Sequence, residues 1–199
     1  MADDLRDLRK RIEFFVSYAH RNQQLAESFI TKLVDHLRPS KAYNYRLWMD
    51  SGIIIGEEWE KQIIEARDKC DFGLLLVSPA FLGSKFIGEN ELPHFVGNNR
   101  TPSIPVMLQP VDLELHDLRG LKALQIFRFT GQRFKEPRAY GECKNNARDA
   151  FVLALFRAIE QKLAAQPGSP HGRCAIKPRS AGDFYVGRLE TSDGRSVLS

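Results

Sequence analysis

Two acidic residues, Glu89 and Glu91, stand a short distance after the most apolar stretch of the chain. That stretch, residues 72–77 with the sequence FGLLLV, has no polar alternation, which indicates a strand covered on both faces of a sheet. A carboxylate just beyond the carboxyl end of such a strand lies where open parallel sheets form their ligand crevice. The position also allows a simpler interpretation, in which acids at a helix start are stabilised by the helix dipole and exposed to water. Residue types alone leave both interpretations open.

The other nucleophilic and ligating side chains match no familiar catalytic motif. Ser17, Ser78 and Ser84 lie in no Gly-x-Ser-x-Gly elbow, so a serine hydrolase is not favoured. The sequence has no Gly-x-Gly-x-x-Gly and no Walker-type phosphate loop, which argues against a Rossmann dehydrogenase and a P-loop NTPase. Among the histidines, only His20 is placed near the expected crevice. We expect no disulfide framework and no metal site, because three cysteines lack C-x-x-C spacing and histidine partners: Cys70, Cys143 and Cys174.

The composition is that of one well-buried globular domain, with 43% hydrophobic and 27% charged residues in a chain of 199. The net charge of +4 is mild and the basic residues form no continuous run, so nucleic-acid binding is not expected. No stretch approaches the roughly 20 apolar residues that span a bilayer, and the N-terminus lacks the apolar core of a signal peptide. We therefore expect a cytoplasmic protein without membrane contact.

Strand and helix patterns alternate along the chain, and the elements that they predict must position Glu89 and Glu91. It predicts an α/β fold, a parallel sheet with helices on both faces. Pro105 places its strand at a sheet edge or a strand start. Because parallel strands end at one rim, the segments 18–22 and 50–56 should meet Glu91 there. The predicted strands are residues 13–18, 45–49, 72–77, 104–108 and 126–129, and the predicted helices are 23–37, 57–70, a stretch after Glu91, and 147–165.

Two further features near this rim have more than one interpretation. Trp48 and Trp59 would suit stacking on a flat ligand, although at their spacing each is more often part of a core. Three consecutive isoleucines, residues 53–55, lie between a turn and a helix start and are flanked by glycines. They form either a buried anchor or a mobile loop that contacts a partner, and the glycines favour the loop.

Several ordered segments together resemble the Toll/interleukin-receptor (TIR) domain family, in the style of its bacterial members. Residues 13–20, EFFVSYAH, are similar to the first-strand box of the family, and residues 46–63 to its second strand, BB loop and following helix. Residues 74–92, LLLVSPAFLGSKFIGENEL, resemble the third strand and the box that carries an acid, and residues 104–112 the fourth strand. The resemblance implies a flavodoxin-like TIR fold with a five-stranded parallel sheet. It covers roughly residues 10–165.

Many members of the family cleave the bond between nicotinamide and ribose in NAD⁺ with one glutamate after the third strand. The resemblance places that glutamate at Glu91, with Glu89 as the fallback. NAD⁺ would then be the substrate, and no separate cofactor is expected. The implied function is an NAD⁺ nucleosidase that yields nicotinamide with ADP-ribose or cyclic ADP-ribose, acts in bacterial antiphage immunity and is activated by self-assembly.

The resemblance also implies the residues that surround the substrate and those that assemble the protein. The implied substrate-binding residues are Tyr18, Ala19, His20, Asp50, Ile54, Ser84 and Ile87. The implied assembly residues of the BB loop are Ile53, Ile54, Ile55 and Gly56. Self-association through TIR–TIR contacts is expected, with a sensor domain or partner protein as a further contact.

One alternative function remains open at this stage. A non-enzymatic TIR interaction module, an adaptor or a host-mimicking effector, would bind other TIR domains through the BB loop alone. Ala19, His20 and Ile87 keep it open, because some NAD⁺-cleaving relatives carry arginines and a tryptophan at these positions. In either case residues 1–10 are expected to be a lead-in and residues 11–165 the TIR domain. Residues 166–199, rich in Pro, Gly and Ser, are expected to be a linker or flexible tail that leads to a further domain.

Overall fold

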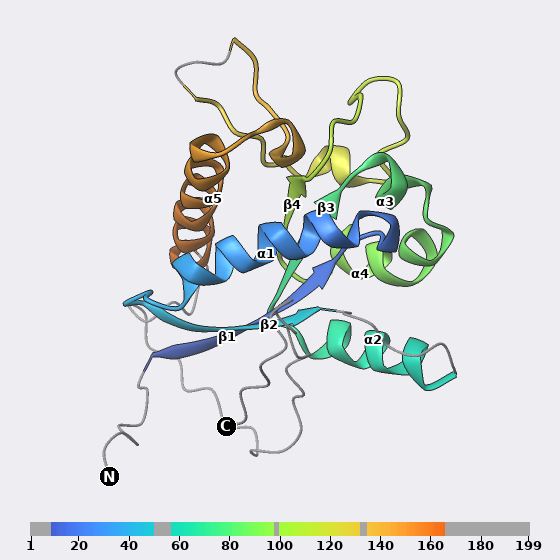
Figure 1. Cartoon of the computed structure of the whole chain (residues 1–199). Coiled ribbons are helices and arrows are strands. Elements are labelled where there is room, and N and C mark those ends of the chain that lie inside the picture. Colours follow the sequence, from blue (N-terminus) through green and yellow to red (C-terminus); the bar gives the residue numbers. More distant parts are fainter. Residues whose placement is uncertain (1–8, 50–56, 98–99, 132–134, 166–199) are drawn as a thin grey trace, which may run out of the picture.

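The computed structural model describes residues 9–49, 57–97, 100–131 and 135–165, and only the backbone of residues 57–60. Its centre is a sheet of four parallel strands in the order β2-β1-β3-β4 (Figure 1). The strands are β1 Lys10–Ser17, β2 Tyr43–Met49, β3 Phe72–Val77 and β4 Ser103–Met107. The chain passes from β1 to β2 on one side and then returns to β3 on the other. This order confirms the predicted flavodoxin-like α/β class, whose ligand crevice lies where the winding reverses, between β1 and β3.

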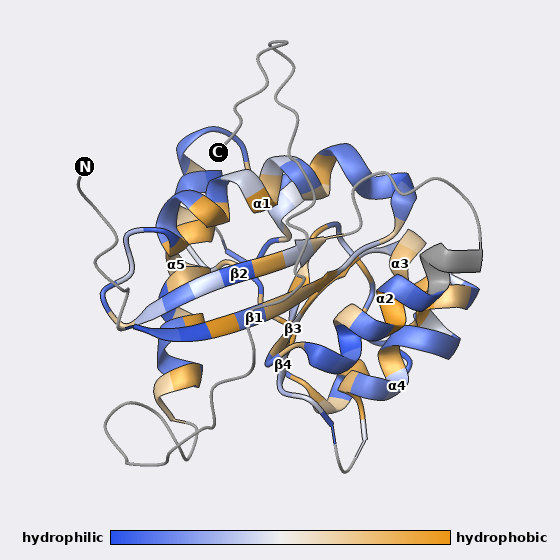
Figure 2. Cartoon of the chain, turned by 90° about the horizontal axis from the view of Figure 1, so that it is seen from below, coloured by the Kyte–Doolittle hydropathy of each residue, from blue (hydrophilic) through white to orange (hydrophobic). Residues whose placement is uncertain are grey.

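Helices cover both faces of the sheet (Figure 1). One face carries α1 Gln23–Leu37 and α5 Asn146–Ala164, and the other carries α2 Glu57–Lys69, α3 Pro79–Gly83 and α4 Leu92–Phe95. Short helical turns complete the fold: η1 His20–Asn22, the π-helical turn η2 Ile87–Glu91, η3 Leu121–Ala123 and η4 Tyr140–Glu142. Figure 2 shows the largely hydrophobic strands β3 and β4 lying between the two groups of helices.

Two hydrophobic cores lie on the two faces of the sheet, because successive side chains of a strand point in opposite directions. On β1, Phe14 and Val16 enter the core under α1 and α5, while Phe15 enters the core under α2, α3 and α4. On β3, Leu74 joins the first core and Leu75 the second. All six residues of β3 are buried, as its continuous apolar sequence predicts.

The predicted fifth strand is reduced to a single bridge. Phe127 pairs in parallel with Val106: its N–H donates to the Pro105 carbonyl at 2.7 Å, and its carbonyl accepts from Met107 at 3.0 Å. The next donor of this ladder would be the N–H of residue 105, which proline lacks. Pro105 therefore limits the pairing and lies on the edge strand of the described sheet, as predicted.

Most of the predicted helices agree with the structure, whereas some other predictions fall outside the described residues. Helix α1 has the predicted bounds, and α2 and α5 lie within one residue of theirs. The helix expected after Glu91 is only the short α4, preceded by the unpredicted turn η2. The tail at 166–199 and residues 1–8 of the lead-in lie outside the described residues. Within the described ranges, no helix is long and apolar enough to cross a bilayer.

Candidate functional site

Glu91 is the last residue of the π-helical turn η2. The N–H of Leu92 donates to the carbonyl of Ile87, five residues earlier, so this turn is wider than an α-helical turn. Pro93 follows within α4. In a regular α-helix its ring would clash with the carbonyl four residues earlier, and the wider turn relieves that clash. Wide turns of this kind occur frequently at functional sites.

The two candidate acids lie in opposite environments. Glu91 is 6% exposed, whereas Glu89 is exposed to solvent. The Ser17 hydroxyl, at the carboxyl end of β1, donates a hydrogen bond to Oε2 of Glu91. A buried carboxylate is costly unless it is hydrogen-bonded, and this contact offsets part of that cost. Of the two acids, Glu91 is therefore the one that the fold holds in a fixed, shielded position.

Glu91 faces a cavity of about 210 Å³ at the carboxyl ends of β1 and β2. Ligand pockets that enclose a drug-sized molecule measure roughly 300–1,000 Å³, so this cavity is smaller than a typical pocket of that kind. Most of its lining is apolar or aromatic. The lining residues come from the end of β1 and the following loop, from β2, from α2 and from the segment 84–91: Phe15, Val16, Ser17, Tyr18, Ala19, His20, Trp48, Ile63, Ser84, Phe86, Ile87 and Glu91.

The structure brings most of the predicted site residues together. Tyr18, Ala19, His20, Ser84 and Ile87 all line the same cavity as the Glu91 carboxylate. Asp50, Ile54 and the rest of the BB-loop set, Ile53, Ile55 and Gly56, lie outside the described residues. The juxtaposition is a finding, whereas substrate binding by these side chains remains a prediction.

Sequence reasoning missed several residues that line the cavity. Ser17 was considered only as a nucleophile, yet it is the hydrogen-bond donor to Glu91. Trp48 was considered as a stacking surface for a flat ligand but was expected more often in a core; it is half-buried at the cavity wall and stacks on Phe15, with ring centroids 5.2 Å apart and planes 9° from parallel. Phe86 and Ile63 were not singled out. Trp48 and Ser17 lie near strand ends, so the rule that strand ends meet at one rim was the available signal for both.

The loop after β1 is fixed by a chain of buried amide and hydroxyl groups. The hydroxyl of Ser78 donates to Oδ1 of Asn22 at 2.6 Å, and Nδ2 of Asn22 donates to Oε1 of Gln109 at 2.9 Å. The same Ser78 oxygen caps α3 by accepting the N–H of Phe81 at 3.0 Å. These contacts join the segments that follow β1, β3 and β4, which holds the cavity wall at residues 18–20 in place.

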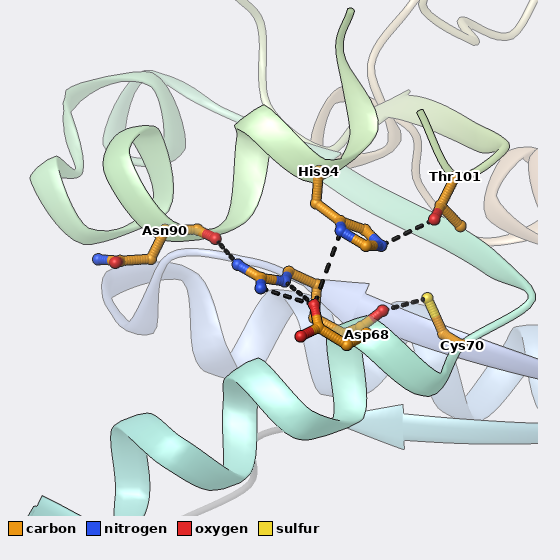
Figure 3. A network of polar contacts seen from close by, with 6 residues as sticks. Asp68, Cys70, Asn90, His94 and Thr101 are labelled. Atoms are coloured by element: carbon orange, nitrogen blue, oxygen red, sulfur yellow. Dashed lines mark hydrogen bonds and ion pairs between the residues drawn. The ribbon is translucent and has the colours of Figure 1, made fainter. Parts of the chain in front are cut away.

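A second polar network lies behind the turn that carries Glu91 (Figure 3). Arg67 of α2 donates through Nη1 to the carbonyl of Asn90 and through Nη2 to Asp68 at 2.6 Å. His94 of α4 lies between Asp68, 3.7 Å from Nδ1, and Thr101, 2.7 Å from Nε2. Burial lowers the pKa of His94, and the charge of Arg67 lowers it further, while Asp68 acts in the opposite direction. The network thus joins α2 and α4 to the backbone beside Glu91.

Cys70 belongs to the same region and is not suited to nucleophilic chemistry. Burial raises the pKa of its thiol to about 12. Its sulfur lies 3.0 Å from the carbonyl of Arg67, to which the thiol donates. A thiol that stays protonated at neutral pH is a poor nucleophile. Cys70 is therefore not a candidate nucleophile for this site.

Comparison with known proteins gives one family match. A family model described as the TIR domain matches residues 14–142, which is more than half of the chain. The matched range includes Ser17, Trp48 and Glu91, and it ends before α5. No curated protein matches the sequence.

Proposed function

The chain belongs to the TIR domain family, and from this premise we propose that it is an NAD⁺ nucleosidase with Glu91 as its catalytic carboxylate. The family includes NAD⁺-cleaving enzymes as well as other TIR domains. The observation that carries the proposal is the placement of Glu91. It is buried, hydrogen-bonded by Ser17 and directed at a cavity near the point where the sheet reverses its winding.

The chemistry of the proposed reaction needs one well-placed carboxylate. The bond between the ribose anomeric carbon and the pyridinium nitrogen breaks, both electrons leave with the nitrogen, and nicotinamide departs neutral. No general acid is required for this leaving group. The ribose meanwhile gains oxocarbenium-like positive charge, which a neighbouring carboxylate stabilises. Water then adds to the anomeric carbon and loses a proton, or an adenine nitrogen of the same molecule adds and closes a ring.

The residues around Glu91 have distinct proposed tasks. Ser17 orients the carboxylate, since its hydrogen bond restricts the rotation of the Glu91 side chain. Trp48 offers an aromatic face near the cavity, while its stacking on Phe15 keeps the indole ring in place. The cavity volume of about 210 Å³ suits the nicotinamide and ribose end of the substrate. A largely apolar wall excludes water and so strengthens the electrostatic contribution of the carboxylate.

We further propose that self-assembly activates the enzyme and that it acts in bacterial antiphage immunity. The three isoleucines at residues 53–55 are the proposed contact between copies, as in the stacked assemblies that the family resemblance implies. A concentrated or clustered preparation is therefore expected to be more active per molecule than a dilute one. Full activity in a strictly monomeric preparation would contradict this part of the proposal.

A non-enzymatic interaction module is the second candidate function, and one observation favours it. The described residues that line the cavity include neither Lys nor Arg, so the lining itself offers no permanently charged cation to the diphosphate of NAD⁺. In this alternative the BB loop alone would bind other TIR domains, and the cavity would have no substrate.

Product analysis distinguishes the two functions. Concentrated wild-type protein and Glu91→Ala are each incubated with NAD⁺, and the products are resolved by chromatography. Nicotinamide release that is lost in Glu91→Ala supports the enzyme, and the second product shows whether ADP-ribose or its cyclic form is made. If neither protein releases nicotinamide, even when clustered on beads, the enzyme is excluded under these conditions and the interaction module is favoured.

A further inference from the structure

The segment 84–91 contributes a whole wall of the cavity but belongs to no strand of the sheet. Ser84, Phe86, Ile87 and Glu91 line the cavity, and all four lie after the end of α3. Before the π-helical turn is complete, the N–H of Gly88 donates to the carbonyl of Ser84 at 3.2 Å, the long end of the ordinary range. A short π-helical turn has poor intrinsic stability, so the position of Glu91 depends on contacts from outside the segment.

The first end of the segment is held by Arg119. This arginine lies between β4 and η3, and its Nη1 donates to the carbonyl of Ser84 at 2.9 Å. Its guanidinium occupies the space where residue 88 has no side chain: a Cβ on Gly88 would lie 1.6 Å from Nη1. The backbone of Arg119 adopts φ = 48°, and its N–H donates to Asp117 Oδ1 at 2.9 Å. A non-glycine residue in this region is strained, and such strain persists only where the surroundings hold it.

The second end of the segment is held by Arg67. Its Nη1 donates to the carbonyl of Asn90, the residue directly before Glu91. The guanidinium is oriented by Asp68, which accepts from Nε at 2.8 Å and from Nη2 at 2.6 Å. The two arginines thus come from elements far apart in the sequence, and each contacts a backbone carbonyl near one end of the same eight-residue segment.

We propose that Arg67 and Arg119 are positioning residues that together form a clamp. Each binds a backbone carbonyl of the segment 84–91 from outside the cavity, and the two contacts fix Glu91 in the cavity. Neither arginine lines the cavity. A charged N–H donor to a carbonyl is stronger than a neutral one, and the rigid fork of arginine loses little freedom on binding. The catalytic consequence rests on the proposed function of Glu91, whereas the clamp itself is a property of the fold.

Matched variants distinguish loss of the two arginine contacts from a general loss of stability. Arg67→Met and Arg119→Met each remove one guanidinium. Gly88→Ala displaces the Arg119 guanidinium without altering the arginine, and alanine is otherwise the better helix former. Gly83→Ala is its control, because a Cβ at residue 83 meets nothing within 4 Å. Arg157→Met, at an exposed position of α5, is the control for loss of an arginine.

The first measurement is hydrogen exchange of the amides in residues 84–92, which needs no catalysis. The three clamp variants are Arg67→Met, Arg119→Met and Gly88→Ala. In each of them the amides of residues 88 and 92 are expected to exchange at least tenfold faster than in wild type. Exchange in β3 and α5 should stay unchanged, and both controls should match wild type. Unchanged exchange in the clamp variants would overturn the proposal. If one arginine variant fails to fold, Gly88→Ala and Arg67→Lys still test the two ends.

The second measurement is the kinetics of nicotinamide release. Misplacement of a catalytic group by about 1 Å costs on the order of 100-fold in rate. The clamp variants are therefore expected to lose about 10- to 100-fold in kcat with little change in KM, and Arg67→Lys should recover part of the loss. Clamp variants with wild-type kcat would overturn the positioning role. If wild type itself releases no nicotinamide, the proposed function fails, while hydrogen exchange still decides whether the clamp exists.

Discussion

Glu91 shows how the environment of a residue distinguishes it from a neighbour of the same type. Glu89 and Glu91 are both acids near a predicted helix start, and the resemblance to the family was the only argument from sequence that preferred Glu91. The fold separates them physically, because Glu91 is buried against Ser17 while Glu89 is exposed. The Ser17 contact was not predictable from the sequence. It depends on the β1–β3 pairing and on how η2 approaches the end of β1, and both are tertiary.

His94 allows a prediction about pH at the same scale. Burial and Arg67 lower its pKa below the ordinary value of 6.5, so between the two values the unfolded chain binds more protons than the folded one. The stability contribution is therefore fully present above pH 6.5 and is lost as the pH falls through the folded pKa. Urea unfolding from pH 7.5 to 5 should show a smaller loss of stability in His94→Gln than in wild type. Equal losses in the two proteins would show that His94 does not contribute to the pH dependence.

At the scale of elements, the sequence predicts periodic segments well and strained ones poorly. The apolar spacing of α1 fixed both of its ends, and the continuous apolar run of β3 identified a central strand. The turn η2 has no periodic signal, because its width depends on Pro93 and on contacts with Arg67 and Arg119. The fifth strand was predicted from a short apolar run, but the missing N–H of Pro105 limits its pairing.

The packing of α4 on β3 leads to a second prediction. The ring of Phe95 lies directly over Gly73: a Cβ at residue 73 would be 2.5 Å from its Cε1. Phe95 is fully buried and stacks on Phe15, with ring centroids 5.8 Å apart, so it has no open space to move into. Gly73→Ala should therefore lower the free energy of unfolding by about 1–3 kcal/mol, measured by urea denaturation.

The double variant identifies the cause of this loss. Phe95→Leu removes the ring atoms that the new methyl group would meet, so Gly73→Ala should cost much less in that background. If the costs of the two substitutions simply add, the contact between residues 73 and 95 does not explain the effect.

For the whole molecule, the folded unit extends beyond the range that the family model matches. The match ends at residue 142, yet α5 follows it and packs against α1 and the sheet. The periodic apolar residues of α5 predicted this helix, and five of its side chains are buried: Phe151, Val152, Leu155, Ile159 and Leu163. The assembly of the cavity from four separate parts of the chain was predictable only in outline, from the rule that parallel strands end at one rim.

Truncation of the chain tests whether α5 is part of the folded unit. Each large apolar side chain stabilises the fold by about 1.5–3 kcal/mol when buried. Five of them together are comparable with the whole stability of a typical domain, about 5–15 kcal/mol. A chain that ends at residue 142 should therefore show no cooperative thermal unfolding. A chain that ends at residue 165 is expected to unfold cooperatively, with a free energy of unfolding within about 0.5 kcal/mol of the full-length value. Cooperative unfolding of the shorter chain would show that α5 is dispensable.

The most direct measurement compares two substitutions that each remove one negative charge with little change in shape. Nicotinamide release from NAD⁺ is followed for wild type, Glu91→Gln and Glu89→Gln at the same high protein concentration, after circular dichroism has shown that all three are folded. Glu91→Gln is expected to lose at least 100-fold in rate, because the amide cannot stabilise the positive charge of the ribose. Glu89→Gln should retain the wild-type rate. Equal activity of Glu91→Gln and wild type, or loss confined to Glu89→Gln, would contradict the assignment of the catalytic carboxylate.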